Sequence, residues 1–280
     1  MKELLLLIRP VIAGLLLAFA LTGCGPTNHS TSTPKLASAT SYLESAAQEF
    51  VGGEQDFVRL AEPGTCPGHF DIRPSQAADL RRCRALVRFD FQSSLDKFLD
   101  AKGTNAPVVV EVKIRNGLCL PDSYLSACRQ FGEAMVARGF LEQANVETTL
   151  QTATARLAAL GHEATNQVAQ AGLAGASVIT SVHQKDFCEW LGLKVVATFR
   201  AAATASVAEI DDAITAGKLA EVKLVIANLP EGRRTADALA ERLKARVAVF
   251  GNFPALDHGR VWFDDLIRTN VAVLLAADRP

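Results

Sequence analysis

Short apolar runs alternate with amphipathic segments along the second half of the chain. The apolar runs are rich in β-branched residues, as strands are, and the segments between them repeat apolar residues at helical spacing. The predicted strands cover residues 177–182, 194–199, 223–227 and 247–250, and the predicted helices cover 185–191, 207–216, 235–243 and 261–275. Because strands that alternate with helices form parallel sheets covered on both faces, this half predicts an α/β lobe.

The first half of the chain shows the same alternation over longer intervals. The predicted strands are 56–61, 85–89 and 108–112, and the predicted helices are 42–51 and 74–82. Residues 121–173 follow an almost continuous helical pattern that is broken near Gly139, and the part from Phe140 to Leu173 contains no proline. That part predicts one helix longer than is usual in globular proteins. We therefore predict an α/β fold of two lobes, each with a parallel sheet flanked by helices, joined by one long connecting helix.

The N-terminus has the pattern of an export signal. Lys2 supplies a positive charge, an apolar run extends from Leu4 to Leu21, and small residues precede Cys24. This layout is typical of a secretory signal, with a transmembrane helix as the alternative for a run of this length. The ending Leu-Thr-Gly-Cys resembles the lipobox of bacterial lipoproteins. The resemblance implies that Cys24 becomes the first mature residue and carries a lipid, which anchors an exported protein at a membrane on the periplasmic or cell-surface side.

The remaining chain divides by composition and pattern. Residues 24–35 are polar and contain nothing to bury, so we expect a flexible tether. The predicted divisions are a signal peptide at 1–23, the tether at 24–35, an N-terminal lobe at 36–139, the connecting helix at 140–173 and a C-terminal lobe at 174–280.

Charge and motifs exclude several classes of function. The formal net charge of −1 gives no reason to expect nucleic acid as a partner. The sequence contains no nucleophile-elbow motif, no His-Glu-x-x-His motif and no phosphate-binding loop, so we predict that the protein is not an enzyme.

Five cysteines follow Cys24, an odd number. An exported domain meets oxidising conditions, so disulfide bonds are expected, with at least one thiol left over. Cys66 with Cys83 and Cys119 with Cys128 are two pairings that would each staple a loop to a helix, and Cys188 has the pattern of a buried core thiol. The sequence alone leaves the pairing open.

Two histidines stand where a ligand would bind. His183 directly follows the predicted strand 177–182, and His69 lies in the loop between the strand 56–61 and the helix 74–82. In parallel α/β sheets, ligands bind beyond the carboxyl ends of the strands. We therefore predict that both imidazoles face a common cleft, one from each lobe. Imidazole is a ligand suited to zinc and to neighbouring transition metals.

Four segments cover nearly the whole mature chain and carry a resemblance to a known family. They are TSYLESAAQEF at 40–50, AEPGTCPGHFDIRPSQAADLRRCRALV at 61–87, VITSVHQKDFCEWLGLKVV at 178–196 and KLAEVKLVIANLPEGRRTADALAERLKARVAVF at 218–250. In their order of strands, ligand loops and helices, these segments resemble the solute-binding proteins of zinc and manganese ABC transporters.

The resemblance implies a function. A monomeric lipoprotein would capture a divalent transition metal in an interlobe cleft, zinc before manganese, and deliver it to an ABC permease. His69 and His183 would be metal ligands. Rival interpretations are a binder of a metal chelate, corrinoid or siderophore, and a metallochaperone or adhesin on the same fold.

The chain also departs from the family's ligand pattern. Where the family has a second histidine, this chain has Gly117 and Cys119, and where the family usually has a carboxylate, it has Asn228 and Asn252. Sulfur from Cys119 or Cys66 is one replacement, and Asp257 or His258 is another. A metal chelate that needs fewer protein donors is the third. The predicted metal ligands are His69, His183 and Cys119.

Overall fold

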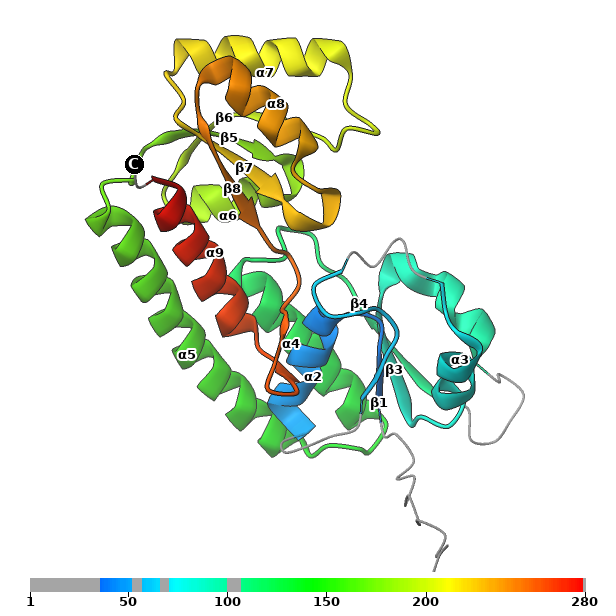
Figure 1. Ribbon diagram of the computed structural model, residues 1–280. Coiled ribbons are helices and arrows are strands. Elements are labelled where there is room, and N and C mark those ends of the chain that lie inside the picture. The colour runs from blue at the N-terminus through cyan, green and yellow to red at the C-terminus, as the bar shows by residue number, and fades with distance from the viewer. Residues whose placement is uncertain (1–35, 52–56, 66–70, 100–106, 279–280) are drawn as a thin grey trace, which may run out of the picture. The chain divides into compact units, whose positions relative to one another are not determined.

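Two parallel sheets organise the computed structural model, which describes residues 36–51, 57–65, 71–99 and 107–278 (Figure 1). Within these residues the N-terminal sheet has the order β2-β1-β3-β4, and every neighbouring pair is parallel. Its strands are β1 (Leu36–Ser38), β2 (Phe57–Arg59), β3 (Ala85–Phe89) and β4 (Val108–Val112).

Helices cover this sheet on both sides. Figure 1 shows α2 and α4 on one side and α3 on the other, and the tyrosines of α2 and α4, Tyr42 and Tyr124, are fully buried with their rings edge to face. The elements are α2 (Ser41–Val51), α3 (Pro74–Leu80), the 3-10 segment η2 (Asp90–Phe98) and α4 (Pro121–Ala137).

The C-terminal sheet has the order β6-β5-β7-β8 and is also parallel throughout. Side chains alternate along each strand. Val178 and Leu224 therefore pack into the core that includes α6 and α9, whereas Ile179 and Val225 pack beneath α7 and α8. The strands are β5 (Ser177–Ser181), β6 (Lys194–Phe199), β7 (Leu224–Asn228) and β8 (Arg246–Phe250). The helices are α6 (Lys185–Trp190), α7 (Val207–Leu219), α8 (Arg234–Leu243) and α9 (Phe263–Asp278).

The long helix α5 (Gln143–Gln170) packs against helices of both halves. At 1.5 Å per residue it is about 42 Å long, and Figure 1 shows it beside α4 and α9. Its buried residues recur at helical spacing along one face, which joins the two halves into one hydrophobic core. The buried residues are Val146, Ala153, Leu157, Leu160, Ala164 and Val168.

The predicted fold class is confirmed. The strands predicted at 85–89, 108–112 and 194–199 have the predicted bounds. The prediction missed β1 and a short antiparallel hairpin made of β9 (Leu256–Asp257) and β10 (Arg260–Val261). Because the hairpin takes up residues 260–261, α9 begins at Phe263 rather than at 261.

The expected disulfide bonds do not form among the described cysteines. Cys83, Cys119, Cys128 and Cys188 are buried free thiols, so the pairing of Cys119 with Cys128 is wrong. Cys83 is free as well, and its thiol donates a hydrogen bond to the carbonyl oxygen of Asp79 at 3.3 Å. The pairing of Cys83 with Cys66 is therefore also wrong, although Cys66 itself lies outside the described residues.

The predicted signal peptide, tether and lipidation site at Cys24 fall outside the described residues. Within the described ranges, no helix combines the length and the apolar character that a membrane crossing requires.

The buried thiols predict a distinctive pattern of reactivity. Burial raises the pKa of the Cys83 thiol to about 11 and that of Cys188 to about 12. Since the thiolate is the reactive form, Ellman's reagent at mildly alkaline pH should react slowly with these described thiols in the native protein. After unfolding without reductant, at least the four described thiols should react. A count below four would show that at least one of them forms a disulfide bond.

Candidate functional site

His183 and Glu231 meet at the carboxyl ends of two adjacent strands. His183 lies in the 3-10 turn η3 (Val182–Gln184), which follows β5, and Glu231 lies in η4 (Leu229–Glu231), which follows β7. Because β5 and β7 are paired, the turns that leave them are neighbours. The distance from His183 Nε2 to Glu231 Oε1 is 3.4 Å, and Ser181 Oγ donates a hydrogen bond to Glu231 Oε2 at 2.6 Å.

This pair combines a fixed carboxylate with an accessible imidazole. The side chain of His183 is 58% exposed and that of Glu231 is 19% exposed. The hydrogen bond to Glu231 raises the pKa of His183 against the opposing effect of burial. For Glu231, burial acts to raise the pKa, but the hydrogen bonds from His183 and Ser181 outweigh it and leave the pKa below its ordinary value. Two donor atoms 3.4 Å apart could both bind one zinc ion at about 2.0–2.1 Å, with the metal in place of the proton between Nε2 and Oε1.

A cluster of buried amide side chains begins at Gln184, the residue that follows His183. We define it as Gln184, Asn228, Asn252 and Asn270, all nearly inaccessible to solvent. Gln184 Nε2 donates to Asn252 Oδ1 at 2.8 Å, to Asn228 Oδ1 at 3.1 Å and to the carbonyl of Gly251 at 3.2 Å. Asn270 closes the cluster, because its side chain both accepts from Gly251 N at 2.8 Å and donates to Gly251 O at 3.0 Å.

Cys119 belongs to this cluster. Its thiol donates to the carbonyl of Gly251 at 3.2 Å and lies 3.4 Å from Asn252 Oδ1, and it accepts from Asn270 Nδ2 at 3.7 Å. Burial raises the pKa of Cys119 far above its ordinary value, and Cys188 adds to the rise. The thiol is therefore protonated at neutral pH and is occupied by hydrogen bonds.

The other predicted ligands have different surroundings. His69 lies outside the described residues. Asp257 and His258 are on the β9–β10 hairpin, where their side chains are 69% and 97% exposed and lie 3.7 Å from each other. In the part of the chain that the structure describes, no group of three or more histidines, cysteines and carboxylates has the arrangement of a metal site.

Two carboxylates near the site were missed in the sequence. Glu231 lies three residues beyond Asn228, one 3-10 turn past the end of β7. Glu231 shares the signal that indicates His183, a polar side chain just beyond a strand, but it lies one turn further along the chain. Asp186 in the first turn of α6 fills the space beside Gly117, whose backbone N–H donates to Asp186 Oδ2 at 2.8 Å.

Comparison with known proteins gives similarity of fold. No protein-family profile matches the sequence, and no curated protein matches it. Among solved structures, the chain shares the fold of periplasmic metal-binding proteins. The resemblance proposed from the sequence is confirmed at the level of the fold.

Three of these structures give the extent of the similarity. One is a periplasmic metal-binding protein from Candidatus Liberibacter asiaticus, with a TM-score of 0.67 and 11% identity over 86% of this chain and 98% of that one. ZnuA aligns with a TM-score of 0.68 and 14% identity over 88% and 99%. The laminin-binding protein Lmb of Streptococcus agalactiae, described as having adhesin and metal-transporting activity, aligns with 0.68 and 14% over 87% and 98%.

The His183–Glu231 pair predicts a titration that can be measured. NMR titration of the metal-free protein should give His183 a pKa above the ordinary value of about 6.5. Glu231→Gln should lower it, because the anionic partner is lost, whereas Glu241→Gln on α8 should leave it unchanged. The pair therefore stabilises the fold below about pH 6.5, and this contribution is lost as the pH rises through the folded-state pKa. Equal His183 titration in wild type and Glu231→Gln would contradict the pairing.

Proposed function

We propose that the protein is an extracytoplasmic solute-binding lipoprotein that captures a transition-metal ion, zinc before manganese, and delivers it to an ABC permease. The observation that carries the proposal is the His183–Glu231 pair, located beyond two adjacent strand ends. A fold shared with metal-binding proteins supports it. The imidazole nitrogen and the carboxylate oxygen are both donors that zinc and manganese accept.

His69 is the third ligand in this proposal. Gly64 and Leu229 line one cavity of about 420 Å³, so the chain passes beside the η4 turn five residues before His69. At a maximum of about 3.5 Å per residue, five residues span up to about 17 Å. That reach supports a site formed by His69 with His183 and Glu231.

Cys119 is a structural thiol in this proposal. A sulfur ligand must be a thiolate, and the surroundings of Cys119 strongly favour the protonated thiol. Its hydrogen bonds to Gly251 and Asn252 would also have to break before the sulfur could reach a metal. A water molecule would complete the coordination of the metal beside the three protein donors.

A metal chelate is the second candidate substrate, because the strand-end site brings one described histidine and one described carboxylate together. A chelator brings its own donor atoms and so needs fewer from the protein. Mass spectrometry of the small molecules released from the metal-loaded protein separates the two substrates. A bare ion releases no organic ligand, and a chelate releases one in proportion to the metal.

The proposed ligands predict a set of affinity changes. His69→Ala, His183→Ala and Glu231→Gln should each weaken zinc binding about tenfold or more, because each removes a donor or the partner that orients one. The double variant of the two histidines should weaken binding by less than the sum of the single effects, since both hold one ion. Isothermal titration calorimetry of the protein without a metal-affinity tag provides the measurement.

Two histidines serve as controls in the same series. His162→Ala, on the exposed surface of α5, and His258→Ala, on the hairpin, should bind zinc as the wild type does. Unchanged affinity in both His69→Ala and His183→Ala would refute the site. A loss confined to His258→Ala would move the site to the hairpin.

Lipidation gives an independent prediction about export. Cys24→Ser should accumulate as an unprocessed precursor without acyl label, because the acylated residue is absent. Metabolic labelling with a fatty acid and the migration of the protein on a gel are the measurements, and Cys83→Ser is the matched control. Normal labelling of Cys24→Ser would disprove the anchoring.

A further inference from the structure

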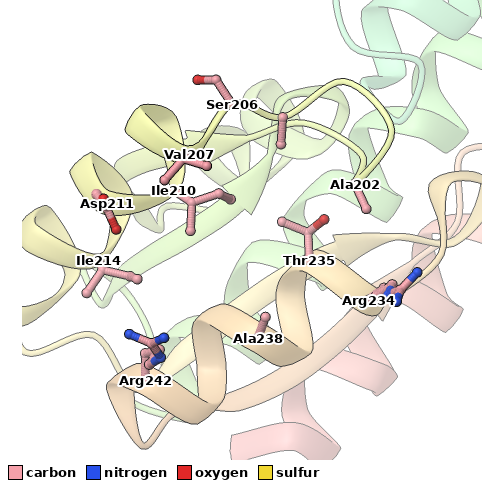
Figure 2. A pocket seen from close by; sticks show the side chains of 11 residues that line it. Ala202, Ser206, Val207, Ile210, Asp211, Ile214, Arg234, Thr235, Ala238 and Arg242 are labelled. Carbon is pink, nitrogen blue, oxygen red and sulfur yellow. The ribbon is translucent and has the colours of Figure 1, made fainter.

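A groove distinct from the strand-end site lies between α7 and α8 on the C-terminal half (Figure 2). Its volume is about 420 Å³, and its lining is mostly apolar. Val207, Ile210 and Ile214 of α7 line the groove, and the two isoleucines also pack partly against the core of the C-terminal sheet. Val207 is 78% exposed and Ile210 and Ile214 are half-buried, whereas the buried residues of α7 are Ala213 and Gly217.

Close packing explains why the fully buried residues of α7 are small. A Cβ atom on Gly217 would lie 2.8 Å from side-chain atoms of both Ile179 and Leu243, so α7 approaches the sheet and α8 too closely for a larger residue. A helix is ordinarily stabilised by burying its large apolar face. Large apolar side chains left at the surface beside one another are typical of an interaction site.

The α8 side of the groove carries positive charge at both ends. Arg234, Ala238 and Arg242 are spaced by four residues and so share one face of the helix. Figure 2 shows the two arginines at opposite ends of the groove with Ala238 between them. Within the described residues neither arginine forms an ion pair, unlike the adjacent Arg233, which pairs with Asp237 at 2.8 Å. Asp211 on α7 lines the opposite wall.

We propose that this groove binds an amphipathic helix of a partner protein. Its apolar stripe would cover Val207, Ile210 and Ile214, and acidic side chains two turns apart would pair with Arg234 and Arg242. Eight residues separate the arginines, which is about 12 Å at 1.5 Å per residue. Acids seven residues apart on a roughly parallel helix lie about 10.5 Å apart and match that spacing.

A helix fits the groove better than an extended peptide. Two helices form the walls, and a third helix packs into such a seam by placing its side-chain ridges in their groove. Anchors at positions i, i+3 or i+4, and i+7 are the usual way in which a helix binds in an apolar groove. A basic residue facing Asp211, on the flank opposite the acids, sets the direction of the helix. The charges select the partner, while the apolar floor provides most of the contact.

A designed peptide tests this surface with the full processed protein. The probe is a fluorescein-labelled helical peptide with leucines at i, i+4 and i+7, two glutamates seven residues apart on one flank, and a lysine on the other. A matched peptide carries lysines in place of the two glutamates. Fluorescence anisotropy should show saturable binding of the glutamate peptide. Arg234→Glu/Arg242→Glu should weaken that binding about tenfold or more and should gain affinity for the lysine peptide.

Two further variants separate the groove from general effects. Val207→Asp should also abolish binding, and its exposure at the start of α7 lets the variant fold, since a negative charge suits a helix N-terminus. Lys218→Glu/Lys223→Glu makes the same change in net charge outside the groove and should bind the peptide as wild type does. Equal affinity for both peptides, or no saturable binding, would overturn the proposal. So would a concentration-dependent dimer in sedimentation that Val207→Asp abolishes, because the occupant would then be a second copy of the chain.

Discussion

The hydrogen bonds between Cys119, Gly251 and Gln184 hold the candidate site in place. The thiol of Cys119 and the amide of Gln184 bond the same carbonyl, that of Gly251, and both lie against Asn252. Buried polar groups are costly unless they are paired, so these bonds leave little freedom to the turns at the ends of β5 and β8. Gln184 immediately follows His183, and the amide cluster therefore fixes the backbone from which the imidazole extends into solvent.

The same bonds tie the two halves of the protein together at the site. Cys119 directly precedes α4, which packs against β4 of the N-terminal sheet, whereas Gly251 follows β8 of the C-terminal sheet. A second contact, from the N–H of Gly117 to the carboxylate of Asp186, joins the same two regions. The long helix α5 supports both halves from one side. A metal held by His183 and Glu231 would thus bind to a rigid, hydrogen-bonded wall.

The sequence predicted the elements with strong local signals and missed those that depend on distant partners. The β-branched runs of β3, β4 and β6 gave their bounds, whereas β1 is only Leu-Ala-Ser and is a strand because β2 and β3 pair with it on either side. The position of His183 beyond a strand end could be predicted because it is a local feature. The hydrogen bonds of Cys119 could not be predicted, because its partner Gly251 is 132 residues away. The expected disulfide bonds rested on the exported location, which says nothing about which sulfurs lie together.

Zinc K-edge X-ray absorption of the loaded, reduced protein tests the central claim most directly, because the shell distances separate nitrogen and oxygen from sulfur. Zinc bound by His183, Glu231 and His69 should show only nitrogen and oxygen neighbours, at about 2.0–2.1 Å, with the outer-shell scattering of imidazole. The spectrum should not change in Cys119→Ser. A sulfur shell at about 2.3 Å that disappears in Cys119→Ser would contradict the account and make the buried thiol a ligand.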